Sequence, residues 1–398
     1  MRNRLVIVIG IALLAVGALA VIAEEGKKAG AAGAPDYQAI ARQIVGESVQ
    51  VKNDEGVVIT GDAAKIPLME ALAVEVAKAG GHPHMVLESE KATKRILTEA
   101  QPQYIERPNK LGLAELKQAS VFIGLSSTDD PSIMAGVPEE RVVLARKANQ
   151  AYISRLYAQP IRTASLGNPE MPTAGVAKFH GVPLPALEKR FWDAVGASHA
   201  SIEQNAEKMK QALAAGREVR ITTKAGTDIR MSVAGRKIMM SDGVIHDAPV
   251  DKPASVWLPA GEVFTSPDRA TVNGKVVVPL FVYNGTKVRD LKLTFQGGRL
   301  TDIQAAQNGQ LLREAVAMAT GDKDQFAFID IGVNPKSAMM PNSNYCSFEM
   351  SGMVTVGIGQ HPWVESANVS EFSEAFFVPQ ATVEVDGRAI VKDGKIQI

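Results

Sequence analysis

One acid, Glu262, stands at the centre of residues 258–267, which read LPAGEVFTSP. Gly261 comes directly before it and prolines lie on both sides, a pattern typical of a turn that presents one carboxylate at a fixed point. A glutamate in a turn is usually a solvated surface group. It becomes a metal ligand only where other carboxylates or imidazoles converge on the same cation. The identity of its partners therefore decides whether Glu262 has a chemical role.

Histidine and cysteine, which supply most other metal ligands and nucleophiles, are scarce in this chain. The six histidines are His82, His84, His180, His199, His246 and His361. None of the first five has the paired spacing that zinc sites use. Cys346 is the only cysteine, which excludes an intramolecular disulfide and favours a structural role. The sequence also lacks the HExxH, GxSxG and glycine-rich phosphate-loop motifs.

Composition excludes some classes of function. The chain has 398 residues, of which 46% are hydrophobic, and this is enough for two domains with proper cores. Its formal net charge is +0 and only 5% of its residues are aromatic. Nucleic-acid-binding proteins usually carry a basic patch and a high isoelectric point. We therefore expect no nucleic-acid partner.

The N-terminus has the pattern of an export signal. Arg2 and Arg4 precede an uninterrupted apolar run at residues 5–23, and charged residues follow it. The run is just long enough to span a bilayer, which favours a retained membrane anchor (residues 1–23) over a cleaved signal peptide. The positive end then stays inside, and the rest of the chain lies on the periplasmic or extracellular side. Residues 24–35, rich in glycine and alanine, are typical of a flexible tether.

Residues 36–216 alternate between helical and strand patterns. Helices are predicted at residues 36–45, 63–79, 90–100 and 138–156, and strands at residues 57–60, 84–87 and 120–124. Alternation of this kind is typical of a parallel sheet covered by helices. We therefore predict an α/β domain in this part of the chain.

From residue 217 the pattern changes to strands. Residues 217–223 and 228–233 alternate apolar and polar side chains, and Gly226 lies between them, so they predict a β-hairpin. Further strands are predicted at residues 275–282, 287–295, 299–304, 354–358 and 382–385, with one helix at residues 309–319. We place a domain boundary near residue 216 and expect a β-rich α+β domain over residues 217–398.

Several of these segments resemble the thermophilic aminopeptidases, the aminopeptidase T family of metallopeptidases. Residues 258–267 resemble that family's first metal-ligand motif, and residues 226–230 (GTDIR) resemble the hairpin that opens its C-terminal domain. Residues 171–173 (MPT) and 385–395 resemble a segment ahead of a helix and the closing hairpin. The resemblance covers nearly all of the chain after the tether. It implies the aminopeptidase T-like fold, a homodimer with an enclosed cavity, and metal-dependent hydrolysis of peptides.

The resemblance also implies ligands for one or two divalent metal ions, such as zinc, cobalt or manganese. Glu262 matches the first ligand. Residues 328–335 (FIDIGVNP) place Asp330 where the family has a second glutamate. The shorter acid can reach a cation after a small backbone shift, and it fits equally well as a hydrogen-bonded acid at the end of a strand. Glu262 and Asp330 are therefore candidate remnants of a metal site.

The remaining ligand positions of the family carry other residue types here. Thr355 stands at the position of a strand histidine, and Pro362 and Trp363 occupy the region of a tyrosine. Ser373 and Ala375 stand where a histidine and an aspartate form the last pair. Hydroxyl and methyl groups do not replace imidazole and carboxylate as ligands of a catalytic cation. The inventory of ligands therefore favours loss of catalysis.

Four residues near the replaced positions are candidates to substitute for the missing ligands: His361, Glu365, Glu371 and Glu374. His361 is the better placed, because it precedes Pro362 in a predicted loop. Glu374 faces away from the Ser373 side if this segment is extended. Charged groups of this kind are more often solvated than metal-bound.

Three hypotheses follow. The first is an exported aminopeptidase-T-like protein with a degenerate metal site, a catalytically impaired homologue that binds peptides or partners. The second is an active metallo-aminopeptidase that releases N-terminal amino acids using Glu262, Asp330 and replacement ligands such as His361 and Glu374. The third is a structural or assembly subunit that keeps only the fold and its dimer contacts.

Overall fold

The computed structural model describes residues 35–126, 128–168, 170–246, 254–340, 345, 347–364 and 366–398. The predicted anchor at residues 1–23, nearly all of the predicted tether, Cys346 and Glu365 lie outside these residues. Among the helices of the described part, none is both long and apolar enough to cross a membrane.

A five-stranded parallel sheet forms the first layer of the fold. Its order is β2-β1-β3-β4-β8, and every neighbouring pair is parallel. The strands are β1 (Gly56–Gly61), β2 (His82–Leu87), β3 (Val121–Leu125), β4 (Arg162–Leu166) and β8 (Ala254–Leu258). Val57, Ile59 and Ile123 are almost fully buried, as expected for strands covered on both faces. The predicted α/β architecture is therefore confirmed.

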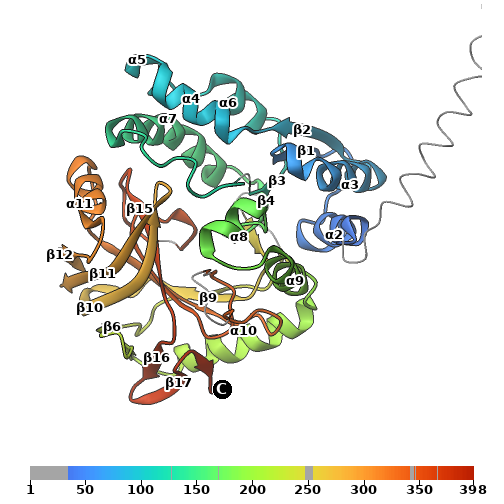
Figure 1. Cartoon of the computed structure of the whole chain (residues 1–398). Coiled ribbons are helices and arrows are strands. Elements are labelled where there is room, and N and C mark those ends of the chain that lie inside the picture. The colour runs from blue at the N-terminus through green and yellow to red at the C-terminus, as the bar shows by residue number, and fades with distance from the viewer. Residues whose placement is uncertain are drawn as a thin grey trace, which may run out of the picture. The chain divides into compact units, whose positions relative to one another are not determined.

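Helices precede and connect these strands along the chain. They are α2 (Tyr37–Gln43), the π-helix η1 (Ile44–Ser48), the 3₁₀-helix η2 (Ala63–Lys65), α3 (Ile66–Lys78), α4 (Glu90–Glu99), α5 (Pro102–Ile105), α6 (Lys110–Leu116), α7 (Glu139–Ala158), α8 (Ala174–His180), α9 (Leu184–Val195) and α10 (His199–Ala214). Side chains of Ser89, Asn109, Thr173 and Ser198 cap α4, α6, α8 and α10 by accepting backbone N–H bonds. In Figure 1, α4, α6 and α7 lie together beside the parallel sheet.

The second layer is an eight-stranded antiparallel sheet. Its order is β12-β11-β10-β6-β5-β16-β17-β18. The strands are β5 (Glu218–Thr222), β6 (Asp228–Ser232), β10 (Asp268–Tyr283), β11 (Thr286–Gln296), β12 (Arg299–Gln304), β16 (Thr382–Val385), β17 (Arg388–Lys392) and β18 (Lys395–Ile396), and α11 (Gly309–Met318) follows β12. Gly226 has a φ of 109° in the turn between β5 and β6, so the predicted hairpin is present.

A third sheet, with the order β15-β14-β13-β9-β7, lies in the core of the molecule. Its strands are β7 (Ile238–Ser241), β9 (Glu262–Thr265), β13 (Phe326–Gly332), β14 (Val354–Gly359) and β15 (Ser373–Val378), and the short 3₁₀-helix η3 (Pro362–Val364) follows β14. Every residue of β9, β13 and β14 is buried. A polar side chain on these strands is therefore cut off from bulk water.

Strand β8 crosses the predicted domain boundary. It lies 38 residues beyond residue 216, yet it pairs with β4 in the parallel sheet. Only three residues, 259–261, separate it from β9 in the third sheet. The boundary itself stays a prediction, but the chain passes back through the parallel sheet before it enters β9.

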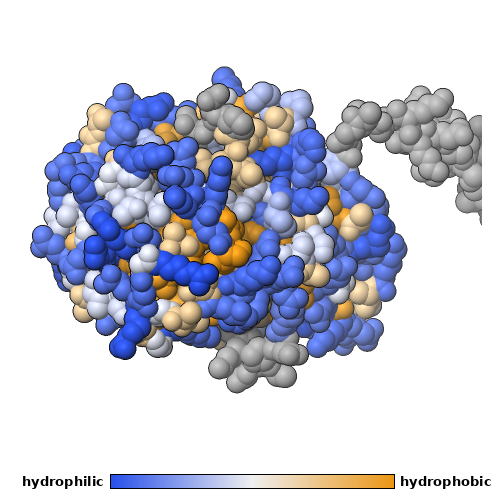
Figure 2. Space-filling view, turned by 90° about the horizontal axis from the view of Figure 1, so that it is seen from below, coloured by the Kyte–Doolittle hydropathy of each residue, from blue (hydrophilic) through white to orange (hydrophobic). Residues whose placement is uncertain are grey.

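Helix α10 and the C-terminal hairpin enclose a hollow of about 470 Å³ on one side of the molecule. It is lined by apolar residues such as Ala212, Val385 and Ile390, with Lys208 and Arg388 also contributing. Figure 2 views the molecule from the side of α10 and β16 and shows hydrophobic surface recessed among hydrophilic residues.

Candidate functional site

Glu262 is the first residue of β9, where the carboxyl ends of β4 and β8 meet. Its side chain is buried, with 4% of the residue exposed. The backbone N–H of Gly167 donates to the Leu258 carbonyl at 2.8 Å, and this places Asn168 so that its Nδ2 donates to Glu262 Oε1. The sequence predicted a turn residue; the turn instead ends at Gly261, and Glu262 already belongs to the buried strand.

Gly261 is required for this geometry. Its φ is +121°, a value that residues with a side chain rarely adopt. A Cβ at this position would lie 2.8 Å from the backbone nitrogen of Asn334. The glycine therefore allows the chain to turn from β8 into β9 in close contact with the segment after β13.

Asp330 lies on β13 and is 1% exposed. It is opposite Phe264 of β9, while Glu262 is opposite Gly332. Residues that face each other in an antiparallel pair project to the same side of the sheet, so the two carboxylates are diagonal neighbours on one face. Thr355 of β14 is opposite Asp330 and projects to this same face. The structure therefore brings the two predicted acids together.

Burial determines the protonation of this pair. Burial raises the pKa of Glu262 to about 8; the hydrogen bond from Asn168 opposes this effect, and the charge of Glu349 adds to it. Burial and then the charge of Glu262 raise the pKa of Asp330 well above its usual value. Within the described residues, no side chain donates a hydrogen bond to Asp330, and Thr355 Oγ1 has no hydrogen-bond partner. The backbone N–H of Ile331 interacts with the Asp330 carboxylate and opposes the rise of its pKa. Glu262 therefore holds its proton at neutral pH.

Glu349 is a third buried acid that the sequence analysis missed. It is 0% exposed, and its Oε1 accepts hydrogen bonds from Arg190 Nη2 at 3.0 Å and Ser337 Oγ at 2.9 Å. Ser347 Oγ donates to its other oxygen. An acid among apolar residues shortly before a predicted buried strand is the sequence signal that points to it. Arg190 fills the role of counter-ion, so Glu349 is committed to an internal ion pair.

The other positions where the resemblance implies ligands fall on the same sheet face, as the register shows. Ala375 of β15 is opposite Gly357, and Ser373 is opposite Gly359, two positions from Gly357 along β14. Because side chains alternate along a strand, Thr355, Gly357 and Gly359 share one side. The positions that the resemblance singles out therefore share one face of the sheet, but this chain carries hydroxyl groups and a methyl group there.

An aromatic cluster occupies this face, made of Trp257, Phe264, Phe328, His361 and Trp363. The ring centroid of Phe328 lies 4.6 Å from that of Trp363 and 4.8 Å from that of His361, and the Phe264 and Trp363 centroids are 5.0 Å apart. The Phe328 ring covers Gly357, where a Cβ would lie 1.9 Å from Phe328 Cε1. Aromatic rings therefore fill the space between Asp330 of β13 and the positions of Ser373 and Ala375 on β15.

The three replacement candidates that the structure describes, His361, Glu371 and Glu374, do not form a cluster of ligands around the two acids. His361 is 6% exposed, and its Nε2 is hydrogen-bonded to the Ile358 carbonyl at 3.1 Å. Burial lowers its pKa to about 4, so the ring is neutral. Glu374 is opposite Ile358 on the other face of the sheet and pairs with Arg146 Nη2 at 3.4 Å. Glu371 accepts a hydrogen bond from the backbone N–H of Thr320 at 2.9 Å.

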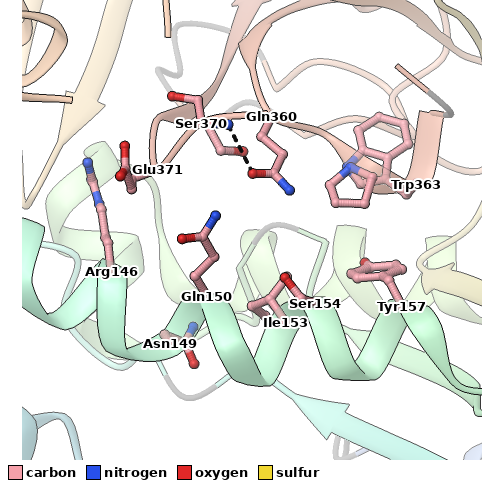
Figure 3. Close-up of a pocket in the computed structure, with 12 residues that line it drawn as sticks. Arg146, Asn149, Gln150, Ile153, Ser154, Tyr157, Gln360, Trp363, Ser370 and Glu371 are labelled. Atoms are coloured by element: carbon pink, nitrogen blue, oxygen red, sulfur yellow. Dashed lines mark hydrogen bonds between the residues drawn. The ribbon is translucent and has the colours of Figure 1, made fainter. Parts of the chain in front are cut away.

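A pocket of about 320 Å³ lies between α7 and the segment that contains η3. Its lining comprises Arg146, Asn149, Gln150, Ile153, Ser154, Tyr157, Gln360, Pro362, Trp363, Ser370, Glu371 and Ser373. In Figure 3, Gln150 of α7 points toward Gln360, and Tyr157 lies below Trp363. Trp363 lines this pocket and also belongs to the aromatic cluster. The pocket therefore borders the aromatic cluster through Trp363 and one of the replaced ligand positions through Ser373.

The parallel sheet and the two antiparallel sheets, with the two acids on one buried sheet face, form an aminopeptidase T-like fold. The chain belongs to the thermophilic metalloprotease (M29) family, whose sequence profile matches residues 35–324. The predicted family and fold class are therefore confirmed.

Individual relatives show the extent of this similarity. Aminopeptidase AmpS of Bacillus subtilis (strain 168) is 31% identical over 98 residues, which span 24% of this chain and only 23% of that relative. The structure of wild-type AmpT from Thermus thermophilus matches with a TM-score of 0.72 and 17% identity, over 91% of this chain and 99% of the other. A 2,5-dihydroxypyridine dioxygenase from Pseudomonas putida KT2440 matches with a TM-score of 0.55 and 13% identity, over 91% and 96% of the two chains. The fold thus also occurs in an oxygenase, so it does not fix the chemistry.

Membership of a metallopeptidase family implies a divalent metal for an active member. Catalytic zinc sites use three protein ligands of imidazole or carboxylate type and keep a further position open for water. In the described part of the chain, no set of three such groups closes around Glu262 or Asp330. The two acids, a threonine hydroxyl and a wall of aromatic rings do not fit a cocatalytic metal pair.

Proposed function

We propose that this chain is a catalytically impaired member of the M29 family that binds peptides without hydrolysing them. The observation that carries the proposal is the content of the sheet face: the Phe328 ring packs over Gly357. Thr355, Ser373 and Ala375 lie on this face, at positions where the resemblance implies metal ligands. Peptide hydrolysis by this class of enzyme needs a water molecule activated by bound metal.

The two acids do not compensate for the missing ligands. A general base has to be ionised at the working pH and has to reach the water it deprotonates. The raised pKa of Glu262 keeps it protonated near pH 7, and both acids are covered by the fold. This supports a structural rather than a catalytic role for the two buried acids.

The pocket beside α7 is where we place the peptide. The carboxamides of Asn149, Gln150 and Gln360 each offer a donor and an acceptor, which matches the N–H and C=O groups of an extended peptide. Tyr157 and Trp363 offer aromatic surface for apolar side chains. We also propose that residues 5–23 export or anchor the chain, and that the chain forms a homodimer; the sequence pattern and the family resemblance are the support for these two points.

One observation favours a second candidate, a working metallo-aminopeptidase. The two carboxylate oxygens of Asp330 are buried, and no described side chain donates a hydrogen bond to them, as would be the case if a cation completed their coordination. This reading needs ligands beyond Glu262 and Asp330, and His361 and Glu374 would both have to leave their present partners.

The test uses the purified full-length chain, prepared without a histidine tag. Hydrolysis of aminoacyl-p-nitroanilides is measured with added zinc, cobalt or manganese, and binding of short peptides is measured by calorimetry. We expect no metal-dependent hydrolysis, and weaker peptide binding in Gln150→Ala than in the control Gln211→Ala, which changes an exposed glutamine of α10. Hydrolysis that requires a stoichiometric metal, with both lost in Glu262→Ala, would establish the second candidate instead.

A further inference from the structure

We infer that Glu203, Asp242 and His246 form a binding site for a divalent transition-metal cation, for which zinc is the probe. The site shares no residue with the sheet face that carries Glu262 and Asp330. It joins the first turns of α10 to the segment that leaves β7, so it has no part in the proposed peptide pocket.

The geometry brings three ligand atoms together. One ligand atom from each residue lies within 4.8 Å of the other two. His246 Nε2 is 2.7 Å from Asp242 Oδ2. Zinc binds histidine nitrogen and carboxylate oxygen at about 2.0–2.2 Å, so two ligands of one ion lie about 3–4 Å apart. Small side-chain rotations therefore suffice to bring all three atoms onto one cation.

The segment that carries two of the ligands is fixed in place. The backbone N–H of Ile245 donates to the Ser48 carbonyl at 3.0 Å, and Gln50 Nε2 donates to the Ile245 carbonyl at 3.1 Å. Asp242 Oδ1 accepts the backbone N–H of Val244 at 3.1 Å, and its side chain is only 4% exposed. One carboxylate oxygen is thereby oriented by the backbone, and the other is turned to His246. Ligands held by their own supporting bonds lose little entropy on metal binding.

The ligand types point to a borderline cation. One imidazole and two carboxylates suit zinc or manganese, whereas calcium takes six to eight oxygens. Glu203 is exposed and the His246 side chain is 55% exposed. A cation held by these three groups keeps open positions for water or for a group from another molecule.

Other histidines show that this arrangement is not general on the surface. His84 also pairs with a carboxylate, Glu115, at 3.4 Å and its side chain is 59% exposed. Throughout the residues that the structure describes, Glu203, Asp242 and His246 are the only three metal-binding side chains whose ligand atoms lie close enough together to hold one ion. His84 is therefore a matched control for His246 in exposure and in carboxylate pairing.

The experiment is zinc titration of the metal-free full-length chain by calorimetry, with calcium as a competitor, on wild type and on single variants. We expect one equivalent of zinc to bind to wild type and to His84→Ala. Loss of groups that merely support a ligand costs about 10–100-fold in affinity, so His246→Ala and Glu203→Gln should each weaken binding by at least about tenfold. Glu207→Gln, one turn further along α10, should bind like wild type.

The outcomes separate this site from the proposed function. Zinc bound by Glu262→Ala but lost from His246→Ala supports the site and leaves the proposed absence of hydrolysis untouched. Equal zinc affinity in wild type, His246→Ala and Glu203→Gln overturns the site, and so does a failure of wild type to bind zinc. Both substitutions are at exposed positions, and thermal melts of the metal-free variants check that they fold like wild type.

Discussion

Burial has the largest effect on the pKa values of the two acids Glu262 and Asp330. Glu262 and Asp330 share one face of a sheet that water does not reach, while Glu349 has its own counter-ion in Arg190. Transfer of an unpaired carboxylate into a protein interior disfavours its charged form. The three acids therefore differ: burial raises the pKa of Glu262 and of Asp330, whereas Glu349 forms an ion pair with Arg190.

The first prediction concerns the pH dependence of stability through Glu262. Its pKa is raised from 4.5 to about 8 in the folded chain. Between these values the folded chain holds a proton that the unfolded chain has released, so the free energy of unfolding falls as pH rises. Denaturant unfolding from pH 5 to pH 8 should show a loss on the order of a few kcal/mol. Glu262→Gln should flatten this slope, and Glu70→Gln, an exposed control on α3, should keep it.

Asp330 contributes to the same slope in the same direction, because its pKa is also raised. The free energy of unfolding of Glu262→Gln is therefore expected to fall with pH less steeply than that of wild type, but not to be independent of pH. An identical slope in wild type and variant would show that Glu262 is ionised in the folded chain, which is the state a bound cation would require.

The second prediction concerns Phe328 as the centre of the aromatic cluster. Its side chain is 0% exposed and packs on Gly357, His361 and Trp363. Phe328→Ala removes these contacts and leaves a cavity, so it should lower the free energy of unfolding by about 3–5 kcal/mol. Phe328→Leu refills part of the volume and should cost clearly less. A loss below about 1 kcal/mol in Phe328→Ala would mean that the ring is not a packed part of this face.

At the scale of elements, a polar network joins α7 to β10 of the eight-stranded sheet and to β15 of the third sheet. Glu139 Oε1 accepts a hydrogen bond from Tyr283 Oη at 2.7 Å, and Arg146 donates to Tyr283 Oη at 3.1 Å and to Glu374 at 3.4 Å. Lys287 of β11 donates to the Phe179 carbonyl at the end of α8. The bonds of Glu139 and Arg146 hold α7, the helix that forms one wall of the pocket in Figure 3.

The third prediction tests this network at Arg146. Burial raises the pKa of Glu374 to about 7, and the charge of Arg146 opposes that effect. Arg146→Ala leaves the partly buried carboxyl group of Glu374, whose side chain is 17% exposed, without its cation, and should cost about 1–3 kcal/mol of unfolding free energy. The double variant Arg146→Ala/Glu374→Gln should recover part of the loss, with a coupling energy of about 1 kcal/mol. Arg95→Ala, which breaks an exposed pair with Glu99, serves as control and should cost below about 0.5 kcal/mol.

Most elements follow from local sequence, and their exceptions have a physical cause. The predicted helix at residues 63–79 and the hairpin around Gly226 match α3 and β5–β6 closely, because caps, periodicity and turn residues are local signals. The membership of β8 in the parallel sheet is not local. Residues 254–258 lie beyond the predicted boundary, and only pairing with β4 decides which sheet they join.

At the scale of the whole molecule, the two acids could be foreseen but their surroundings could not. The resemblance singled out Glu262 and Asp330, and register places them on one face. Phe328 packs on Trp363, which lies more than 30 residues further along the chain. Glu349 pairs with Arg190, which is 159 residues away in the sequence. No local pattern encodes such distances, so sequence reasoning left this part of the site unassigned.

The last prediction follows from β8, which joins the parallel sheet to the third sheet. Trp257 of β8 faces the aromatic cluster, 6.1 Å from Phe264 and 5.4 Å from Trp363 between ring centroids, while the β8 backbone pairs with β4. Separation of the α/β part from the β-rich part would therefore break the pairing of β8 with β4, or the contacts of Trp257 with the other rings of the aromatic cluster. We expect one cooperative unfolding transition, with the same midpoint by tryptophan fluorescence and far-UV circular dichroism.

Destabilising β8 should move both signals together. Val256 is 2% exposed in this strand, and Val256→Ala should lower the common midpoint through a loss of about 1–3 kcal/mol. Val74→Ala, at a 47% exposed position of α3, serves as control and should leave it almost unchanged. Two resolved midpoints in wild type, or a shift of only one signal in Val256→Ala, would show that the α/β and β-rich parts unfold separately and that β8 does not couple them.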